Sequence, residues 1–557
     1  MASGPPTPCR LPMIFHPSTH PDRRVSVFAQ LIAVCLIIVG CKFWLIASDS
    51  SPLPFLDQWK GEGAEVLRPW INGTLRITDL FAPFNEHRMV PTRLLALGLF
   101  EANAHQWDGQ VEMVVGAMLH ATCAFILGLI LLRCLGDGNR LPIFAILLVL
   151  FSLPFGWQNT VGGFQSQFYF LILFTLATLC GLGWNAAGTW HWWGGVAAGL
   201  IACITFGSGG FAGLALAGWL GLKLLTDSAA WRQRANWITP GIALTLGLLG
   251  FALYTPTQNE AIIALHSRSP GHFLYGLGIR LAWPNRVSPF LALPAFAPFA
   301  TLLWVRLREI RSDGLAKVGH QLDDLLFPLG FWVILQTAAV AWARNGPAAS
   351  VVSRYMDLLA LGCLVNFCCL LQLAAPAAGT SALRWKRRAV IMCAIVWSGL
   401  TLAGLTQLID RNIRVDLPGL RQVQRAQILA IRKFLISDQI ADLGGKRTFG
   451  LSPADLELLA GLLRDPVIQD ILPTGIGVRR AVVPTGPLSA ASRALADAWA
   501  LVLATGGLVW ILASASRFSM RRRSLCSREE RTHSLSRGGK ANDPSSERTG
   551  IRPCGAR

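Results

Sequence analysis

Charged residues are scarce in this chain of 557 residues. Asp, Glu, Lys and Arg make up only 15% of the sequence, whereas 52% of the residues are hydrophobic. A soluble protein of this length would form several domains with far more surface charge. The apolar residues occur in blocks of about 20, the helix length that crosses a hydrocarbon core of roughly 30 Å. We therefore expect an all-α membrane protein, because lipid offers no partners to unpaired backbone N–H and C=O groups.

The apolar blocks predict about 12 transmembrane helices. The first, from about Val27 to Ala47, follows Arg23 and Arg24 and exceeds the roughly 7–15 apolar residues of a signal peptide, which favours a retained anchor over a cleaved leader. The other predicted spans lie at about 111–133, 141–156, 165–184, 190–208, 209–226, 237–256, 287–306, 322–344, 355–374, 389–409 and 496–516. The segment around His272–Arg286 contains two arginines and a proline, so we expect an interfacial or re-entrant piece rather than a thirteenth span.

Basic residues are few in the short loops on one side of this arrangement. Membrane proteins carry an excess of Lys and Arg in their cytoplasmic loops. The loops Pro154–Phe164 and Gly207–Gly210 have none, whereas alternate loops carry clusters such as residues 384–388. We therefore expect both termini inside (N-in/C-in), in a multi-pass protein of the inner, or plasma, membrane. Attraction to anionic membrane lipids then explains the formal net charge of +19, and no nucleic-acid partner is expected.

Signals for disulfides, metal fingers and repeats are missing as well. None of the 13 cysteines falls in a predicted outer loop, so no disulfide framework is expected, and no CxxC spacing occurs. No internal repeat is visible, which counts mildly against a secondary carrier built from repeated halves.

Two long outer loops organise the rest of the chain. Residues 1–22 are Pro-rich and the tail 517–557 is rich in Arg, Ser and Gly, so both are expected to be disordered and cytoplasmic. Between them we expect a membrane domain at 23–409 with its first outer loop at 48–110, an outer helical cap at 410–495 and a last span at 496–516. Helical spacing of apolar residues predicts juxtamembrane helices at Leu420–Ile436 and Pro453–Leu463, the second with Ser452 as its N-cap.

The first outer loop carries basic groups beside a predicted helix start. Pro91 suits the first turn of a helix, and an apolar helical stretch follows it. The positive end of that helix, together with Arg88 and Arg93, would form a phosphate-binding point near the membrane surface.

Two carboxylates and a histidine of the same loop suit the chemistry of a phosphate. Asp57, Glu86 or His87 could take a proton from an acceptor hydroxyl while the phosphate leaves a donor sugar. Alternatively they could hold a divalent cation, Mg²⁺ or Mn²⁺, with Asp57 and Glu86 as ligands, that neutralises the leaving phosphate. The plain alternative is a wet loop in which Glu86 forms a surface ion pair with Arg88 or Arg93.

Further polar residues are expected on the same side. Gln165 and Gln167 follow a pair of glycines and could bind sugar hydroxyls, although a solvated loop explains them equally well. Arg354 stands before Tyr355 near the outer end of a span, where it could bind a lipid phosphate or simply pair with Asp357 at i, i+3. Weaker candidates are Arg344, Glu260, His266 and Arg268 on that side, and His120 within a span, which is expected to be a buried neutral histidine.

This layout resembles the GT-C superfamily of membrane glycosyltransferases. Those enzymes have a first span, an acidic residue in the first outer loop, a juxtamembrane helix and about ten more spans, and they use polyprenyl-phosphate or pyrophosphate sugar donors. The stretches that carry the resemblance to bacterial members without assigned substrates are Leu56-Asp57-Gln58-Trp59, Asn85-Glu86-His87-Arg88, Gly163-Phe164-Gln165-Ser166-Gln167-Phe168 and Ser353-Arg354-Tyr355. One departure is Gln58, because many members have a second acidic residue after the Asp. Glu86 would then have to supply the second group for a metal ion.

The resemblance implies a glycosyltransferase that moves a hexosyl or pentosyl group from a lipid-linked donor to an acceptor on the outer face of the inner membrane. Asp57 would be the general base or ion ligand, with Glu86 and His87 as helpers. The residues expected to hold substrate or phosphate are Arg88, Arg93, Gln165, Gln167, Arg354 and Tyr355. Two alternatives stay open, namely a transporter or flippase for a lipid-linked or polar solute, and a non-catalytic polysaccharide-assembly protein.

Overall fold

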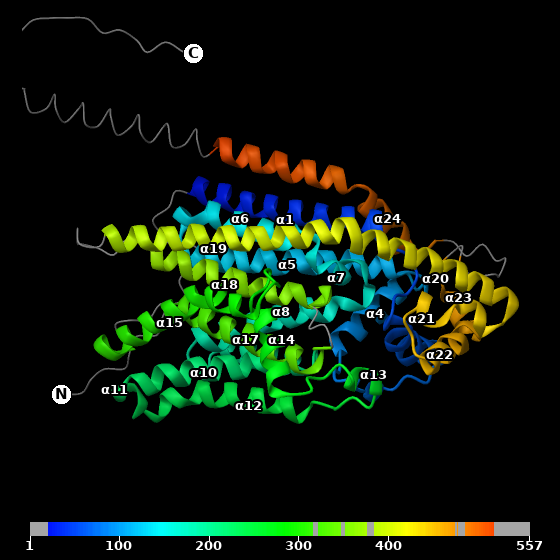
Figure 1. Cartoon of the computed structure of the whole chain (residues 1–557), viewed down its shortest axis with the longest axis horizontal. Coiled ribbons are helices and arrows are strands. Elements are labelled where there is room, and N and C mark those ends of the chain that lie inside the picture. Colours follow the sequence, from blue (N-terminus) through cyan, green and yellow to red (C-terminus); the bar gives the residue numbers. More distant parts are fainter. Residues whose placement is uncertain are drawn as a thin grey trace, which may run out of the picture.

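The computed structural model describes residues 21–315, 321–346, 351–375, 384–473, 476 and 485–516. Within these ranges the protein is helical, without strands, and has one isolated bridge between Phe84 and His87. The long helices run side by side along the longest axis, and α20, α22 and α23 gather at one end of them (Figure 1). We call this the cap end. The predicted disordered tails fall almost entirely outside the described residues.

Ten helices of the described part are long and apolar enough to cross a membrane, which confirms a multi-pass membrane protein in outline. They are Val25–Asp49, Gly109–Leu135, Arg140–Val161, Gly163–Trp184, Arg234–Ala252, Pro289–Asp313, Asp323–Ala343, Ser353–Ala374, Arg388–Ser437 and Trp499–Ser516. The spans predicted at 190–208 and 209–226 are the shorter helices α9 (Trp190–Cys203) and α10 (Phe211–Thr226). The predicted interfacial piece is α14 (Pro270–Leu281), a helix of 12 residues.

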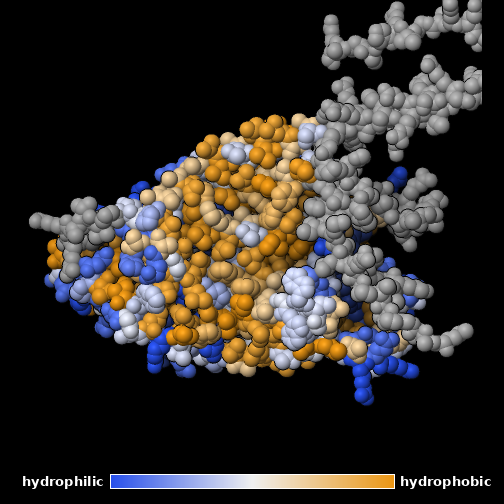
Figure 2. Space-filling view, turned by 180° about the vertical axis from the view of Figure 1, so that it is seen from behind, coloured by the Kyte–Doolittle hydropathy of each residue, from blue (hydrophilic) through white to orange (hydrophobic). Residues whose placement is uncertain are grey.

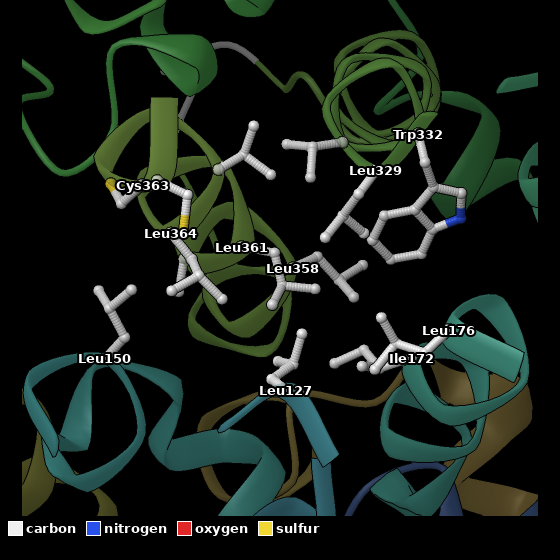
Figure 3. Packing of buried hydrophobic residues seen from close by; sticks show 14 of the residues in the cluster. Leu127, Leu150, Ile172, Leu176, Leu329, Trp332, Leu358, Leu361, Cys363 and Leu364 are labelled. Carbon is white, nitrogen blue, oxygen red and sulfur yellow. The ribbon is translucent and has the colours of Figure 1, made fainter. Parts of the chain in front are cut away.

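The core of the bundle is built around α18 (Met356–Ala374), which is apolar on nearly all sides and is the most buried of the spans. Leu358 and Leu361 of α18 face Trp332 of α17 (Asp323–Ala343) and Ile172 of α8 (Ser166–Trp184) (Figure 3). A helix that is hydrophobic all round belongs in the interior of a bundle. The outermost helices, by contrast, turn apolar side chains outward, and hydrophobic residues cover the middle of the face shown in Figure 2.

The helices around this core follow in chain order. They include α1 (Pro21–Asp49), α5 (Gly109–Leu135), α6 (Arg140–Ser152), α7 (Trp157–Val161), α12 (Ile238–Ala252), α15 (Ala292–Asp313) and α19 (Arg384–Arg411). Short helices between them are α11 (Ser228–Trp231), α13 (Glu260–Ile263) and α24 (Pro487–Asp497). Helices α8 and α9 touch backbone to backbone, since a Cβ on Gly181 would come within 2.5 Å of Gly195 Cα.

The two long loops fold together into a second, smaller core at the cap end. From the first loop come the π-helix η1 (Trp59–Leu67), α2 (Arg68–Ile71), α3 (Ile77–Leu80) and α4 (Val90–Ala102), and from the second come α20 (Leu417–Ser437), α21 (Gly445–Thr448), α22 (Pro453–Arg464) and α23 (Pro466–Ile471). Trp59 and Trp107 pack there against Phe434 and Leu463. The helices predicted at 420–436 and 453–463 are confirmed, and Ser452 caps α22 by accepting from Asp455 N–H.

Candidate functional site

Two adjoining cavities lie at the cap end of the bundle. The smaller is a polar pocket of about 50 Å³, and the larger is a mostly aromatic and aliphatic cavity of about 500 Å³. Four residues line both of them: His87, Phe206, Arg344 and Tyr355. The polar pocket is also lined by Asp57, Asn85, Gln165, Gln167 and Arg354, and Glu86 lines the apolar cavity. The first long loop, the start of α8, the end of α17 and the start of α18 thus converge on one place.

Asp57 lies in a turn that is held in place by hydrogen bonds of the buried Gln58 side chain. The Gln58 amide oxygen accepts from the Phe55 N–H (3.0 Å), and its nitrogen donates to Glu62 (3.0 Å) and Glu112 (3.1 Å). The Asp57 side chain itself remains 45% exposed, and its Oδ2 lies 3.7 Å from Arg354 Nη1. Such an accessible, long ion pair is weak and opens easily. Gln58, which stands where many GT-C enzymes have a second acidic residue, therefore has a structural role here.

Glu86 forms a close bidentate pair with Arg344. The two Nη atoms lie 2.8 and 3.1 Å from the carboxylate oxygens, and the Glu86 side chain is only 4% exposed. Burial alone would raise the pKa of Glu86, but the hydrogen bonds and charge of Arg344 outweigh it and hold the pKa below its usual value. Glu86 therefore stays ionised and engaged. Its partner is not Arg88 or Arg93, as the wet-loop alternative assumed.

His87 is a neutral hydrogen-bond donor rather than a base. Its Nδ1 accepts the Gly207 N–H (3.1 Å), which leaves the proton on Nε2, and its ring stacks on Phe206 at 3.8 Å. Burial lowers the pKa of His87 to about 4; Glu86 opposes this shift and Arg344 and Arg354 add to it. Position 207 needs glycine, because a Cβ would lie 2.6 Å from Glu86 O.

Arg354 is held by its backbone, which leaves its side chain to the pocket. It sits in the turn η7 (Ser353–Tyr355), where its N–H donates to Gln158 Oε1 (3.2 Å) and its carbonyl accepts from Asn159 Nδ2 (2.8 Å). Asn159 Nδ2 also donates to Asp357 Oδ2 (2.8 Å). The i, i+3 pair between Arg354 and Asp357, one of the two alternatives from the sequence, does not form. Asp357 bonds to Asn159, and Arg354 turns to Asp57.

The two predicted glutamines lie side by side in the pocket wall. Gln167 Nε2 donates to Gln165 Oε1 (3.3 Å), and both side chains are buried. Gln167 Oε1 has no hydrogen-bond partner within the described protein. Because a buried unpaired acceptor costs free energy, it favours a ligand that donates there, such as a sugar hydroxyl.

Arg88 and Arg93 lie away from both cavities. Arg93 is fully buried; it donates to three backbone carbonyls of residues 79–82 and pairs with Glu65. Arg88 donates to the carbonyls of Leu253 and Phe81. Pro91 does lie in the first turn of α4, as predicted, but the Val90 N–H there donates to Ile204 O. These groups organise the first loop, and the basic side chains at the pocket are Arg344 and Arg354 instead.

The expected divalent-cation ligands do not come together. Asp57 faces Arg354, Glu86 faces Arg344, and the described residues contain no group of three or more His, Cys, Asp or Glu side chains placed to hold a metal ion. Hard cations need several oxygen ligands on one point. The residues present therefore do not fit Mg²⁺ or Mn²⁺ in this arrangement.

Comparisons with known proteins do not assign the chain to a family. No family model matches it, and neither a curated protein nor a solved structure does.

Proposed function

We propose that the chain is a membrane glycosyltransferase that moves a hexosyl or pentosyl group from a polyprenyl-phosphate donor to an acceptor hydroxyl on the outer face of the inner membrane. One observation carries the proposal. Asp57, Gln165, Gln167, Arg354 and Tyr355 line one polar pocket that adjoins an apolar cavity of about 500 Å³. Such a pairing suits an amphiphile with a sugar phosphate at one end and a hydrocarbon chain at the other.

The two arginines are the groups that would hold the phosphate. A guanidinium binds phosphate through two parallel hydrogen bonds, which is stronger than its contact with a distant carboxylate. The Arg354–Asp57 pair, at 3.7 Å and partly exposed, is the one that a phosphate displaces most easily. Its displacement frees Asp57 for chemistry. Arg344 keeps its buried partner Glu86 and adds positive charge at the boundary of the two cavities.

The transfer itself needs one proton acceptor and one stabilised leaving group. The freed Asp57 carboxylate takes the proton of the acceptor hydroxyl, whose oxygen attacks the anomeric carbon of the donor sugar. The bond from that carbon to the phosphate oxygen breaks, and the electron pair leaves with the polyprenyl phosphate. Arg354, Arg344 and the Nε2–H of neutral His87 stabilise the added negative charge.

The interior of the bundle favours an enzyme over a carrier. Asp357, Lys42 and His120 extend the polar region from the pocket into the spans, where His120 stacks on Tyr169. Beyond them the described core is apolar and closely packed, with residues such as Leu127, Leu147 and Leu179 fully buried. A carrier would need polar groups along the whole route.

Transfer by the full chain in lipid nanodiscs tests the proposal. Radiolabelled polyprenyl-phosphate hexoses and pentoses are supplied with an extracted envelope glycan, and the released polyprenyl phosphate is measured. Asp57→Asn should reduce the rate by about 10²–10⁴-fold. The matched control is Asp410→Asn, an exposed aspartate that pairs with Arg414 and lines neither cavity. An equal rate in the Asp57 variant and the control contradicts the proposal.

The predicted orientation has its own test. A single cysteine placed at exposed Asn72 in the first loop should react with an impermeant maleimide added to intact cells, whereas one at exposed Ser228 at the other end should not. Reaction of both sites from the same side would remove the outer-face assignment.

A further inference from the structure

An arginine that lines neither of the two cavities donates a hydrogen bond to the backbone carbonyl of Arg344. Arg280, in α14, is 1% exposed and its Nη atoms bond to neutral groups. Nη1 donates to Gly276 O (2.9 Å) and to Asn345 Oδ1 (2.9 Å), and Nη2 donates to Arg344 O (2.8 Å). Burying a guanidinium costs free energy unless its N–H groups are well bonded. Two hydrogen bonds of the Arg280 guanidinium therefore hold the Arg344–Asn345 turn.

Asn345 makes further hydrogen bonds that hold the same turn. Its Nδ2 donates to Ser267 Oγ (3.0 Å) and to His272 O (2.8 Å), while its backbone N–H donates to Leu265 O (2.9 Å). The turn that follows α17 is thus tied to α14 and to the chain just before it.

The absence of a side chain at Gly276 leaves room for the Asn345 side chain next to α14. A Cβ at position 276 would lie 2.1 Å from Asn345 Oδ1, closer than any side chain allows. The approach of α14 to the turn therefore depends on one glycine, on the face of the helix that also presents Arg280 one turn later.

The backbone of the Arg344–Asn345 turn determines the direction in which the Arg344 side chain leaves α17. Helix α17 ends at Ala343, and Arg344 has left helical geometry (φ −139°, ψ 39°). From this fixed backbone its side chain reaches Glu86 and the boundary of both cavities. A functional side chain keeps its geometry only if the groups behind it are themselves fixed.

We propose that Arg280, Asn345 and Gly276 form a positioning clamp that holds Arg344 against Glu86 and toward the phosphate of the donor. The ligand in this statement rests on the proposed function, whereas the positioning concerns protein groups alone. The short helix α14 then contributes to the function of the site, although none of its residues lines the polar pocket.

The titration of His87 reports on the clamp without any ligand. The charged groups that act on His87 are Glu86, Arg344 and Arg354. If Arg344 moves away, its positive charge no longer opposes protonation of the ring, and the pKa of His87 rises. The ring resonances of isotopically labelled histidine, assigned with His87→Gln, are followed against pH in nanodiscs. Arg280→Met should shift the titration in the same direction as Arg344→Gln.

The control and a second variant separate positioning from general loss of structure. Arg306→Met removes a partly buried arginine, which pairs with Asp323 at the far end of the bundle, and should leave the His87 titration unchanged. Gly276→Ala displaces Asn345 without removing a charge and should reproduce the shift. A folded Arg280→Met protein whose His87 titrates as in the wild type, while Arg344→Gln shifts it, overturns the clamp; if Arg280→Met does not fold, the same result with Gly276→Ala does so.

Binding of polyprenyl phosphate adds the readout for function. We expect Kd to rise at least tenfold in Arg280→Met, with partial recovery in Arg280→Lys, which keeps the charge and some of the hydrogen bonds. A wild-type protein that does not bind this probe contradicts the proposed function but leaves the His87 result to decide the clamp. A wild-type protein that binds it, with an equal Kd in Arg280→Met, contradicts the link between clamp and phosphate.

Discussion

The two ends of the bundle both bury arginine or lysine next to carboxylates, but they do so in different ways. At the end opposite the cap, Lys223 of α10 pairs with Asp324 and Arg306 of α15 pairs with Asp323 of α17, beside a cavity of about 620 Å³. These pairs join one regular helix to another. At the cap end the carboxylates come from a loop and the arginines from turns after or before helices.

This difference separates groups that hold helices together from groups that can change partners. Asp324 also accepts from Trp219 Nε1 (2.8 Å), so it is fixed from two sides. At the cap end, Asp57 has a long contact with Arg354, and the buried Gln167 Oε1 has no hydrogen-bond partner within the described protein. A carboxylate that is fixed from two sides keeps its partners, whereas one with a single long, exposed ion pair can exchange that partner for a ligand.

The largest expected effect contrasts the aspartates of the two ends. Asp57→Asn should lower sugar transfer by about 10²–10⁴-fold and change the free energy of unfolding by less than about 1 kcal/mol. Asp324→Asn leaves the partly buried Lys223 ammonium without its partner, so it should lower stability while the folded fraction keeps its transfer rate. Rate and thermal unfolding are measured on the same nanodisc samples. Equal profiles for the two variants would erase the distinction between the ends.

The two ion pairs of the cap end should differ from each other in stability. Glu86→Gln removes the carboxylate from the buried Arg344, so the cost is expected at about 3 kcal/mol. The partly exposed Asp57–Arg354 pair should contribute less than about 1 kcal/mol. Urea unfolding of the two single variants, with Arg344→Gln as the reciprocal change, measures the contrast. A larger cost at Asp57 than at Glu86 would reverse the assignment of fixed and exchangeable pair.

The buried carboxyl groups of Glu62 and Glu112, which both accept from Gln58, should make the stability of the cap end depend on pH. Burial raises the pKa of Glu62 to about 7 from an ordinary value of 4.5, and hydrogen bonds with Glu112, Gln58 and Trp107 oppose this shift. A raised carboxyl pKa means that the folded state binds the proton more tightly, so this stability is full below pH 4.5 and is lost as the pH rises through about 7. The unfolding temperature should therefore fall between pH 5 and pH 8.

Glu62→Gln identifies the source of that pH dependence. The amide mimics the protonated acid beside Glu112 and should flatten the profile of unfolding temperature against pH. Asp108, which also lies close to Glu112, remains unchanged in this variant. An unaltered slope would assign the pH dependence to another group.

The smallest expected effect concerns the arginine that sequence reasoning placed in the phosphate site. Arg88 donates to two backbone carbonyls and lines neither cavity. Arg88→Gln should therefore change the Kd for polyprenyl phosphate by less than about twofold, with a stability cost of about 1 kcal/mol. Arg354→Gln, measured beside it, should weaken binding at least tenfold. Similar losses in both variants would return Arg88 to the site.

The sequence predicts well what depends on residues near each other along the chain. Long apolar blocks give the helices, Ser452 gives the start of α22, and Pro91 lies in the first turn of α4. Asp57, Gln165 and Arg354 were expected on one side of the membrane, and they do line one pocket.

What the sequence misses depends on contacts between distant segments. Arg344 looks like an ordinary basic residue after a span, and its pairing with Glu86 is 258 residues away along the chain. Arg93 looks like a phosphate ligand, but it donates to backbone carbonyls at and just after the end of α3, and no residue pattern predicts such acceptors. The continuation of α19 into α20 was missed as well, because a π-helical turn at Asn412–Asp416 precedes Pro418.

The affinity of the Asp57→Asn protein for polyprenyl phosphate tests the central claim most directly. If phosphate displaces Asp57 from Arg354 and so frees the base, removing the carboxylate charge removes a competitor. The variant should then bind the lipid phosphate several-fold more tightly than the wild type while transferring sugar about 10²–10⁴-fold more slowly, and Arg354→Gln should bind it weakly. Weaker or unchanged binding in Asp57→Asn would contradict the exchange of partners at the heart of the proposed reaction.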